Sequence, residues 1–348
     1  MEERLLDFTY AKIKKLAIHF VGNQAQEEGY EVAQNMLTEF PEDLNGTLLN
    51  IFLENFKADD YFHFTHETSL DFNEVYTYSQ NIFADSSHFL EDTLNILKHL
   101  YSVSTHPNIK SGDLWVFEME GLVIDGEMCS GLGIFKVENK EVYLKNNFNG
   151  KEFAISYDKG ITGADLDKGC LILNAEAEKG GKVLVLSKLT KNDSIYWKDR
   201  FLSVERTVDN KFLTENFVEL CTDYIKQKEE SLLEKSEFVK AANEYLQEEE
   251  NIQIDTFTEK ALQDPIKQAE FKTAVENFEQ ENNLHFPVEF EVDEERAEKL
   301  NKKVRKTLKL GKNITLTIKD LENLDEADFV QGYDNDRGRN YMIVYYDE

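Results

Sequence analysis

Between residues 113 and 206 the sequence breaks into short runs that are rich in β-branched and aromatic residues, with Gly, Asn and Asp between them. The runs are DLWVFEMEGLVID, GLGIFKVEN, EVYLKNNF, EFAISYD, GCLILN and KVLVLSKL. Runs of this length and composition, bounded by turn residues, are typical of β-strands. We therefore predict an antiparallel, meander-like sheet of about six strands in this part of the chain.

Helical spacing is frequent on both sides of this stretch. In residues 1–110, AKIKKLAIHFVGN indicates an early strand, whereas EVAQNMLTEF, LNGTLLNIFLENF and HFLEDTLNILKHLY place apolar residues on one helical face. Residues 211–283 carry three amphipathic stripes. Their members are Leu213, Phe217, Leu220 and Tyr224; Leu233, Phe238, Ala242 and Tyr245; and Ile266, Phe271, Ala274, Val275 and Phe278. We expect at least one stripe to be buried against the rest of the chain or against a second copy, as a homodimer.

The C-terminal part returns to mixed structure. It contains a charged helix around 292–307, the strand NITLTI, and a final hairpin in which DFVQGY and NYMIVYY flank the turn DNDRGR. We therefore predict an α+β fold. It has a mixed N-terminal α/β region with an antiparallel meander sheet, a helical middle and a small C-terminal α/β subdomain. The expected domains are residues 1–207, 208–283 and 284–348.

The chain is strongly acidic, with a net charge of −29 at pH 7. Such a surface repels nucleic acid and anionic lipid as a whole and attracts basic protein surfaces. Any contact with nucleic acid therefore requires a local basic patch or a protein partner. The N-terminus MEERLLDFTYAKIKKLAIHF does not resemble a signal peptide, and no stretch approaches the ~18 apolar residues of a membrane span. We expect a cytoplasmic protein without a membrane partner.

Basic residues concentrate in one run, KLNKKVRKTLKLGK. It contains no acid and seven bases, which are Lys299, Lys302, Lys303, Arg305, Lys306, Lys309 and Lys312. At helical spacing, Lys299, Lys302, Lys303 and Lys306 would share one face, and such a face can neutralise several phosphates. The alternative is a solvated helix end whose bases balance the acids upstream, as the helix dipole favours. Those acids are Glu291, Asp293, Glu294, Glu295 and Glu298. A second basic stretch, Lys179 to Arg200, has six bases beside Asp193 and Asp199.

Three other motifs contain residue types that are typical of ligand sites. HFTHE brings His63, His66 and Glu67 together, but its histidines are spaced i, i+3 rather than i, i+4 as in a zinc helix. In DNDRGR, Gly338 occupies a position where a calcium loop needs an oxygen ligand, so we predict a hairpin turn. The triplet Asp-Lys-Gly occurs twice, and we predict turns at Gly160 and Gly169, at least one with positive φ.

Sequence signatures of catalysis are absent. The chain has no G-x-S-x-G, H-E-x-x-H, phosphate-loop or dinucleotide-binding pattern. The three cysteines, Cys129, Cys170 and Cys221, are far apart and match no metal or disulfide pattern, which fits a reducing compartment. We therefore expect a non-enzymatic protein that needs no metal and no cofactor.

Several segments together resemble a known family. In order along the chain they are FHFTHETSLDFNEVYTYSQNIF, HLYSVSTHPNIKSGDLWVFEME, GLGIFKVENKEVYLK, DKGITGADLDKGCLILN, YWKDRFL and KTLKLGKNITLTIKDLENLDEADF. Their order and texture resemble the bacterial nucleoid-associated protein family, the NdpA-like group, over nearly the whole chain. The resemblance implies a cytoplasmic, non-enzymatic protein that associates with the bacterial chromosome.

The leading hypothesis is thus nucleoid association through DNA phosphates, without sequence specificity. The contacts would come from the basic run Lys299–Lys312, joined by Arg337 and Arg339. A different class of function stays open: an acidic interaction protein that binds a basic, DNA-handling partner and imitates the charge of DNA. A third hypothesis is a metal-dependent hydrolase that uses His63, His66 and nearby acids.

Overall fold

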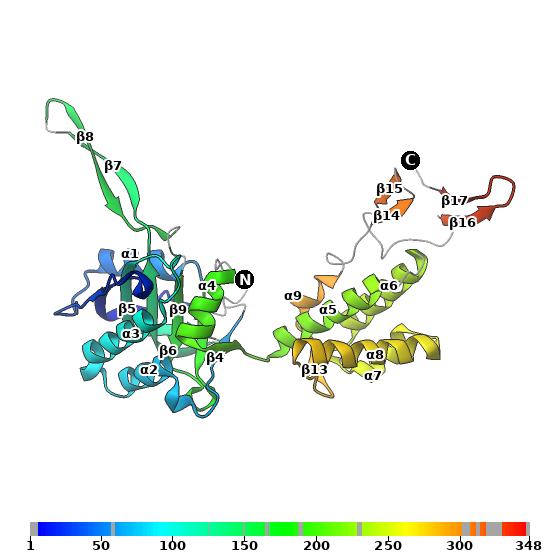
Figure 1. Cartoon of the computed structure of the whole chain (residues 1–348), viewed down its shortest axis with the longest axis horizontal. Helices are drawn as coiled ribbons and strands as arrows, with labels where there is room; N and C mark the ends of the chain where they lie inside the picture. Colours follow the sequence, from blue (N-terminus) through cyan, green and yellow to red (C-terminus); the bar gives the residue numbers. More distant parts are fainter. Residues whose placement is uncertain are drawn as a thin grey trace. The chain divides into compact units, whose positions relative to one another are not determined.

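An antiparallel nine-stranded sheet organises the first part of the chain (Figure 1). The strand order is β11-β4-β10-β9-β6-β5-β2-β3, and β1 pairs with β5 beside this path. The strands are β1 (Leu6–Asp7), β2 (Lys12–Val21), β3 (Tyr30–Glu31), β4 (Phe62–Phe64), β5 (Gly112–Ile124), β6 (Glu127–Val137), β9 (Lys168–Leu173), β10 (Lys182–Val185) and β11 (Val204–Arg206). Strands β2 and β4 precede the predicted six-strand stretch in sequence. The sheet therefore contains strands from most of the length of the first 207 residues.

The computed structural model describes residues 6–56, 60–124, 126–148, 150–163, 166, 168–186, 191–227, 232–300, 307–310, 314–317 and 329–345. The chain divides into two compact units, Met1–Thr207 and Val208–Glu348. Helices and antiparallel sheets both contribute to the described part, which confirms the predicted α+β class.

Helices cover both faces of the large sheet. They are α1 (Glu42–Leu53), α2 (Glu74–Ala84), α3 (Phe89–Val103) and α4 (Lys191–Ser194), which continues as a π-helix over Ile195–Leu202. Phe52 of α1 packs against Phe117 in one apolar core. Ile96 of α3 shares a second core with Val116, the neighbour of Phe117 on β5. Adjacent residues of a strand point to opposite faces, so the central strands are buried on both sides. This explains the apolar runs in their sequences, such as CLIL in β9.

Two strands of the predicted meander leave the sheet. β7 (Glu141–Phe148) and β8 (Phe153–Gly160) pair with each other as a separate hairpin, while β6 pairs directly with β9. The six predicted strand segments are therefore confirmed, but the single continuous meander is wrong. The strands that flank the hairpin in sequence, β6 and β9, are direct neighbours in the sheet. Phe135 of β6, for example, faces Gly169 of β9.

The helix expected at EVAQNMLTEF is also wrong. The chain instead forms β3 and then runs beside β2, where the backbone groups of Leu37 and Leu16 exchange hydrogen bonds of 2.8 and 2.9 Å. Backbone hydrogen bonds to the edge of β2 thus replace those of a helix, and the spacing of apolar residues does not show this. Short 3₁₀ turns complete the unit at Gln24–Gln26, Leu70–Phe72, Ser86–His88 and Ala177–Lys179.

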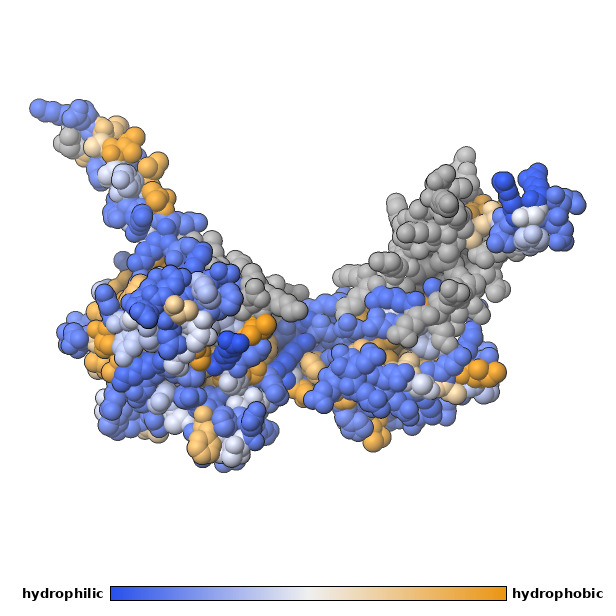
Figure 2. All heavy atoms as spheres, viewed as in Figure 1, coloured by the Kyte–Doolittle hydropathy of each residue, from blue (hydrophilic) through white to orange (hydrophobic). Residues whose placement is uncertain are grey.

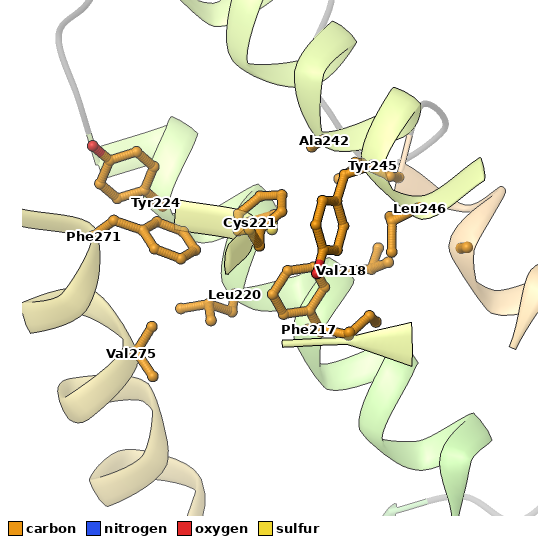
Figure 3. Packing of buried hydrophobic residues seen from close by; sticks show 14 of the residues in the cluster. Phe217, Val218, Leu220, Cys221, Tyr224, Ala242, Tyr245, Leu246, Phe271 and Val275 are labelled. Atoms are coloured by element: carbon orange, nitrogen blue, oxygen red, sulfur yellow. The ribbon is translucent and has the colours of Figure 1, made fainter. Parts of the chain in front are cut away.

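The second unit has an α-helical core. Its elements are α5 (Asn210–Gln227), α6 (Leu232–Glu248), α7 (Ile254–Ala261), α8 (Pro265–Asn282), α9 (Glu294–Ala297) and the short strand pair β12 (Asn251–Ile252) and β13 (Phe290–Glu291). Aromatic rings fill the space between the helices, as Tyr224 and Phe271 do with ring centroids 5.0 Å apart (Figure 3). All three predicted stripes contribute buried side chains to this core. The expectation that a stripe is buried is therefore confirmed within the chain itself.

Two further hairpins follow the helical core. β14 (Thr307–Leu310) pairs with β15 (Ile314–Thr317), and β16 (Phe329–Asp334) pairs with β17 (Arg339–Val344). The predicted strand NITLTI and the final hairpin are confirmed. The helix predicted around 292–307 is wrong at its end, because α9 stops at Ala297 and residue 307 already belongs to a strand.

Candidate functional site

The basic run 299–312 is only partly within the described residues. Lys299 lies in a turn after α9, and its Nζ is 3.8 Å from Oε1 of Glu295. Lys309 lies on β14 rather than on a helix, because the backbone there pairs with β15. Lys302, Lys303, Arg305, Lys306 and Lys312 lie outside the described residues.

Arg337 and Arg339 lie at the turn of the β16–β17 hairpin. The Asp334 carboxylate accepts the backbone N–H groups of Asp336 (2.9 Å) and Arg337 (3.0 Å), and Gly338 has φ +61°. These features close the turn and confirm a hairpin rather than a calcium loop. The side chain of Arg337 is 83% exposed, with Nε 3.6 Å from Asp334 Oδ2. The turn therefore presents two guanidinium groups to solvent.

Tyrosine rings extend the same hairpin away from its turn. Tyr333, Tyr341 and Tyr345 are all exposed. Gly332 makes room for the ring of Tyr341, since a Cβ at 332 would lie 2.4 Å from the Tyr341 hydroxyl oxygen. The result is a two-stranded ribbon with arginines at its tip and exposed aromatic rings along its strands. This combination suits backbone phosphates and the faces of bases.

A buried ionic cluster in the first unit was not predicted. Lys136 is fully buried on β6, and its Nζ is 2.5 Å from the Lys110 carbonyl oxygen and 3.2 Å from Glu138 Oε1. Lys168 on β9 has its Nζ 3.0 Å from the same Glu138 oxygen and 2.8 Å from Asp193 Oδ1. Two cations and two carboxylates thus balance each other between the sheet and the helix that begins at Lys191.

The electrostatics of this cluster differ at its two lysines. Burial lowers the pKa of Lys136 to about 8, although Glu138 opposes the shift. Burial also acts against the charge of Lys168, but the attraction of Glu138 and the hydrogen bond to Asp193 together raise its pKa above the usual value. Burial raises the pKa of Tyr196, whose hydroxyl is 2.9 Å from Ser104 Oγ. These groups hold the helix on the sheet through compensated charge.

A pocket of about 240 Å³ lies beside this cluster. It is lined by His106, Asn108, Ile109, Asp193, Ile195, Tyr196 and Arg200. One signal in the sequence could have pointed to the cluster: Lys136 interrupts the apolar run GIFKV, where a surface residue is unexpected. The partners Lys168 and Asp193 are distant in sequence and carry no comparable signal.

The histidines of HFTHE do not converge on a metal site. His63 lies on β4, with Nδ1 3.4 Å from Thr207 Oγ1. His66 Nδ1 accepts the backbone N–H of Thr68, and its ring packs against Phe72. Within the described ranges, no group of three or more His, Cys, Asp or Glu residues could hold a metal ion.

The turns predicted at Gly160 and Gly169 are wrong. Both glycines lie within strands, β8 and β9, and neither has a positive φ. An aromatic ring lies close to each of them instead. A Cβ at Gly169 would lie 2.5 Å from the Phe135 ring, and one at Gly160 would lie 2.9 Å from the Tyr143 ring.

An acidic groove of about 950 Å³ lies on the second unit. Its lining residues are Asn243, Leu246, Gln247, Glu248, Glu249, Glu250, Asn251, Glu291, Val292, Glu294, Ala297 and Glu298. With six glutamates, this groove disfavours phosphates and favours basic groups.

Comparison with known proteins assigns the chain to a family. The family model described as nucleoid-associated protein YejK matches residues 17–344, which is nearly the whole chain. No curated protein matches the sequence. In the described part of the chain, no helix combines the length and apolar character that crossing a bilayer requires. The family match confirms the resemblance seen in the sequence segments, and the chain belongs to the bacterial nucleoid-associated protein family represented by YejK.

Proposed function

We propose that this protein associates with the bacterial nucleoid without catalysing a reaction and contacts DNA phosphates through local bases. The proposed contacts are Arg337 and Arg339 on the β16–β17 hairpin together with the basic run 299–312. Family membership supports the nucleoid, and with it the cytoplasm, as the location.

The observation that carries this proposal is the exposed hairpin with arginines at its turn and tyrosines along its strands. A two-stranded ribbon fits the major groove of B-DNA, which is about 12 Å wide. Guanidinium groups bind phosphates with directed N–H donors. Because the chain has a net charge of −29, contact with DNA must be local, and repulsion between DNA and the rest of the surface lowers the affinity.

A salt-resolved titration tests the proposal. The anisotropy of a labelled duplex is measured with the full chain over a range of salt concentrations. Affinity is expected to fall with a log–log slope of about −0.9 per phosphate contacted, which gives near −4 from four to five contacts of the basic run and about −2 more from Arg337 and Arg339. The double variant Arg337→Ala/Arg339→Ala is expected to make the slope shallower by about 2 and to weaken binding equally on unrelated duplexes.

A matched control removes two exposed bases elsewhere. Lys179→Ala/Arg200→Ala changes the net charge by the same amount but lies in the first unit. We expect the slope to stay as in the wild type. A quadruple variant of Lys302, Lys303, Arg305 and Lys306 to Ala is expected to lose most of the slope. Equal effects of the two double variants would show that only total charge matters and would contradict a local contact.

The acidic groove favours one alternative function, binding of a basic, DNA-handling protein. This alternative takes over if the wild type does not bind duplex DNA even at low salt. Its test is capture of basic DNA-handling proteins from nuclease-treated lysate. Glu248→Gln/Glu250→Gln/Glu298→Gln, which removes charge from the groove, is expected to abolish capture. Undiminished capture by that variant would exclude the groove.

A further inference from the structure

The β7–β8 hairpin has two chemically different faces. Directly opposed residues of an antiparallel pair lie on the same face. One face contains the pairs Val142–Lys159, Leu144–Tyr157, Asn146–Ile155 and Phe148–Phe153, so six of its eight side chains are large and apolar. The other face contains Glu141, Tyr143, Lys145, Asn147, Ala154, Ser156, Asp158 and Gly160.

The side chains of the polar face contact one another, whereas on the apolar face the rings of Phe148 and Phe153 lie together with their centroids 4.9 Å apart. The Lys145 ammonium lies 2.7 Å from Asp158 Oδ2 and 5.3 Å from the centre of the Tyr143 ring. The Tyr143 ring also lies over Gly160. The six apolar residues of the other face are 59–76% exposed. Figure 2 shows orange, hydrophobic spheres along one side of the hairpin.

Nothing in the described part of the first unit covers this apolar face. Every residue of β7 is exposed, as is every residue of β8 up to Lys159. The two strands pair only with each other among the described strands, so both outer edges are also open. A two-stranded hairpin on its own is at best marginally stable in water, and exposed apolar patches of this kind mark interaction sites.

We propose that the apolar face of the β7–β8 hairpin is a homodimerisation surface that packs on the same face of a second copy of this chain. In an isologous contact the same patch serves both partners. With the two-fold axis at the middle pair, Asn146–Ile155, the pair Leu144–Tyr157 of one copy lies on Phe148–Phe153 of the other. At both ends of the contact, the two phenylalanine rings of one copy then pack on the leucine and tyrosine side chains of the other.

The available area is sufficient for a specific dimer. If each of the five apolar residues in this contact buries on the order of 100–150 Å², the two copies bury about 1,000–1,500 Å² in total. Specific interfaces begin at roughly 1,000 Å². The hairpin alone can therefore supply the interface.

Charge also favours a second copy of the hairpin. The apolar face carries no acid, and its one charged residue, Lys159, lies at the end outside the central contact. Two chains of net charge −29 repel each other over most of their surfaces, but not here. Asn146 lies on the axis, and its amide is both donor and acceptor, so it can bond to its copy and fix the register.

Two neighbouring residues on opposite faces provide the test. Ile155→Glu places a charge on the apolar face, and Ser156→Glu places the same charge on the polar face of the same strand. Molecular mass is measured by sedimentation across the micromolar range. The wild type and Ser156→Glu are expected to dimerise equally, and the dissociation constant of Ile155→Glu is expected to rise at least about tenfold. A wild type that stays monomeric, or an Ile155→Glu variant that dimerises like the wild type, overturns the proposal.

Cross-linking tests the geometry independently. In a Cys129→Ser background, Asn146→Cys is expected to give a covalent dimer with a short bismaleimide, whereas Asn147→Cys on the opposite face is not. Equal cross-linking of both would contradict face-to-face packing. Salt separates this surface from DNA contact, since screening strengthens association between copies of like charge and weakens binding to phosphates.

Discussion

At the scale of single residues, two glycines that follow the same Asp-Lys pair have different surroundings. A Cβ at Gly169 would meet the buried ring of Phe135 at 2.5 Å and the Leu186 side chain at 2.9 Å. A Cβ at Gly160 would meet the ring of Tyr143 at 2.9 Å, but this ring is exposed and can move away. Identical sequence triplets therefore have unequal structural importance.

We expect Gly169→Ala to lower the free energy of unfolding by about 1–3 kcal/mol, because an extra methyl group in a filled core forces its neighbours to shift. Gly160→Ala is expected to change it by less than about 0.5 kcal/mol, as surface substitutions usually do. Urea unfolding followed by circular dichroism measures both. Similar losses for the two variants would contradict the difference in packing.

Contacts of single residues were the least predictable from the sequence. The prediction of turns at Gly160 and Gly169 rested on the preference of glycine for turns. That preference does not take the neighbouring strand into account. What holds a glycine in β9 is the ring of Phe135, 34 positions earlier in the sequence and adjacent only after the sheet forms. Cross-strand neighbours of this kind leave no local pattern.

At the scale of elements, the ionic cluster joins three of them. Lys136 lies on β6, Lys168 lies on β9, and Asp193 lies on the helix that begins at Lys191. Glu138 contacts both lysines and is itself almost fully buried. Removal of its charge would leave two buried ammonium groups with too little negative charge beside them.

Glu138→Gln is therefore expected to destabilise the first unit by about 3–5 kcal/mol, the usual cost of breaking a buried ion pair from one side. Asp193→Asn is expected to lower the free energy of unfolding by less, because Lys168 retains its ion pair with Glu138. The loss in Glu138→Gln is expected to shrink as the pH rises towards about 8, since over that range the folded variant binds fewer protons than the folded wild type. The reason is the pKa of Lys136, which burial already lowers to about 8 and which falls further without Glu138.

Chemical unfolding of both variants at several pH values measures this effect. If the cost of Glu138→Gln were independent of pH, Lys136 would not be the group that responds.

Elements were predictable where their own residues decide the outcome. The strand runs between residues 113 and 206 and the helices α1, α3, α5 and α8 follow from periodicity and composition. The segment EVAQNMLTEF has Val32 and Met36 at helical spacing, yet its backbone bonds to the edge of β2. Likewise, the composition of β7 and β8 predicts strands but not that they leave the sheet, because pairing depends on distant partners.

At the scale of the whole molecule, each unit has apolar cores of its own. The second unit buries side chains from Leu213 to Leu300 in one cluster. The first unit encloses two clusters, one on each face of the large sheet. The boundary between the units follows Thr207.

We expect the fragments 1–207 and 208–348 to fold separately, because each keeps its complete core. Each fragment is expected to give a cooperative thermal transition and native-like near-ultraviolet circular dichroism. A fragment 208–348 without a cooperative transition would show that its core depends on the first unit.

The family was predictable at this scale because the resemblance rests on the order of many segments, which survives errors in single elements. Which bases contact DNA was less predictable, since a run of lysines in sequence does not define their neighbours in space. Lys309 illustrates the point, because its position on β14 separates it from the helical face that the spacing suggested.

The pairing of β4 also affects how the protein is made. Its three residues, Phe62–Phe64, form bridges with β10 and with β11, which ends at Arg206. During synthesis at about 5–20 residues per second, β4 must therefore leave the ribosome on the order of ten seconds before both neighbours exist. Its unpaired edges are open to other chains during that interval, and pairings so distant in sequence form slowly. Nascent-chain crowding and chaperone supply are thus expected to influence the yield of this protein more than its final stability does.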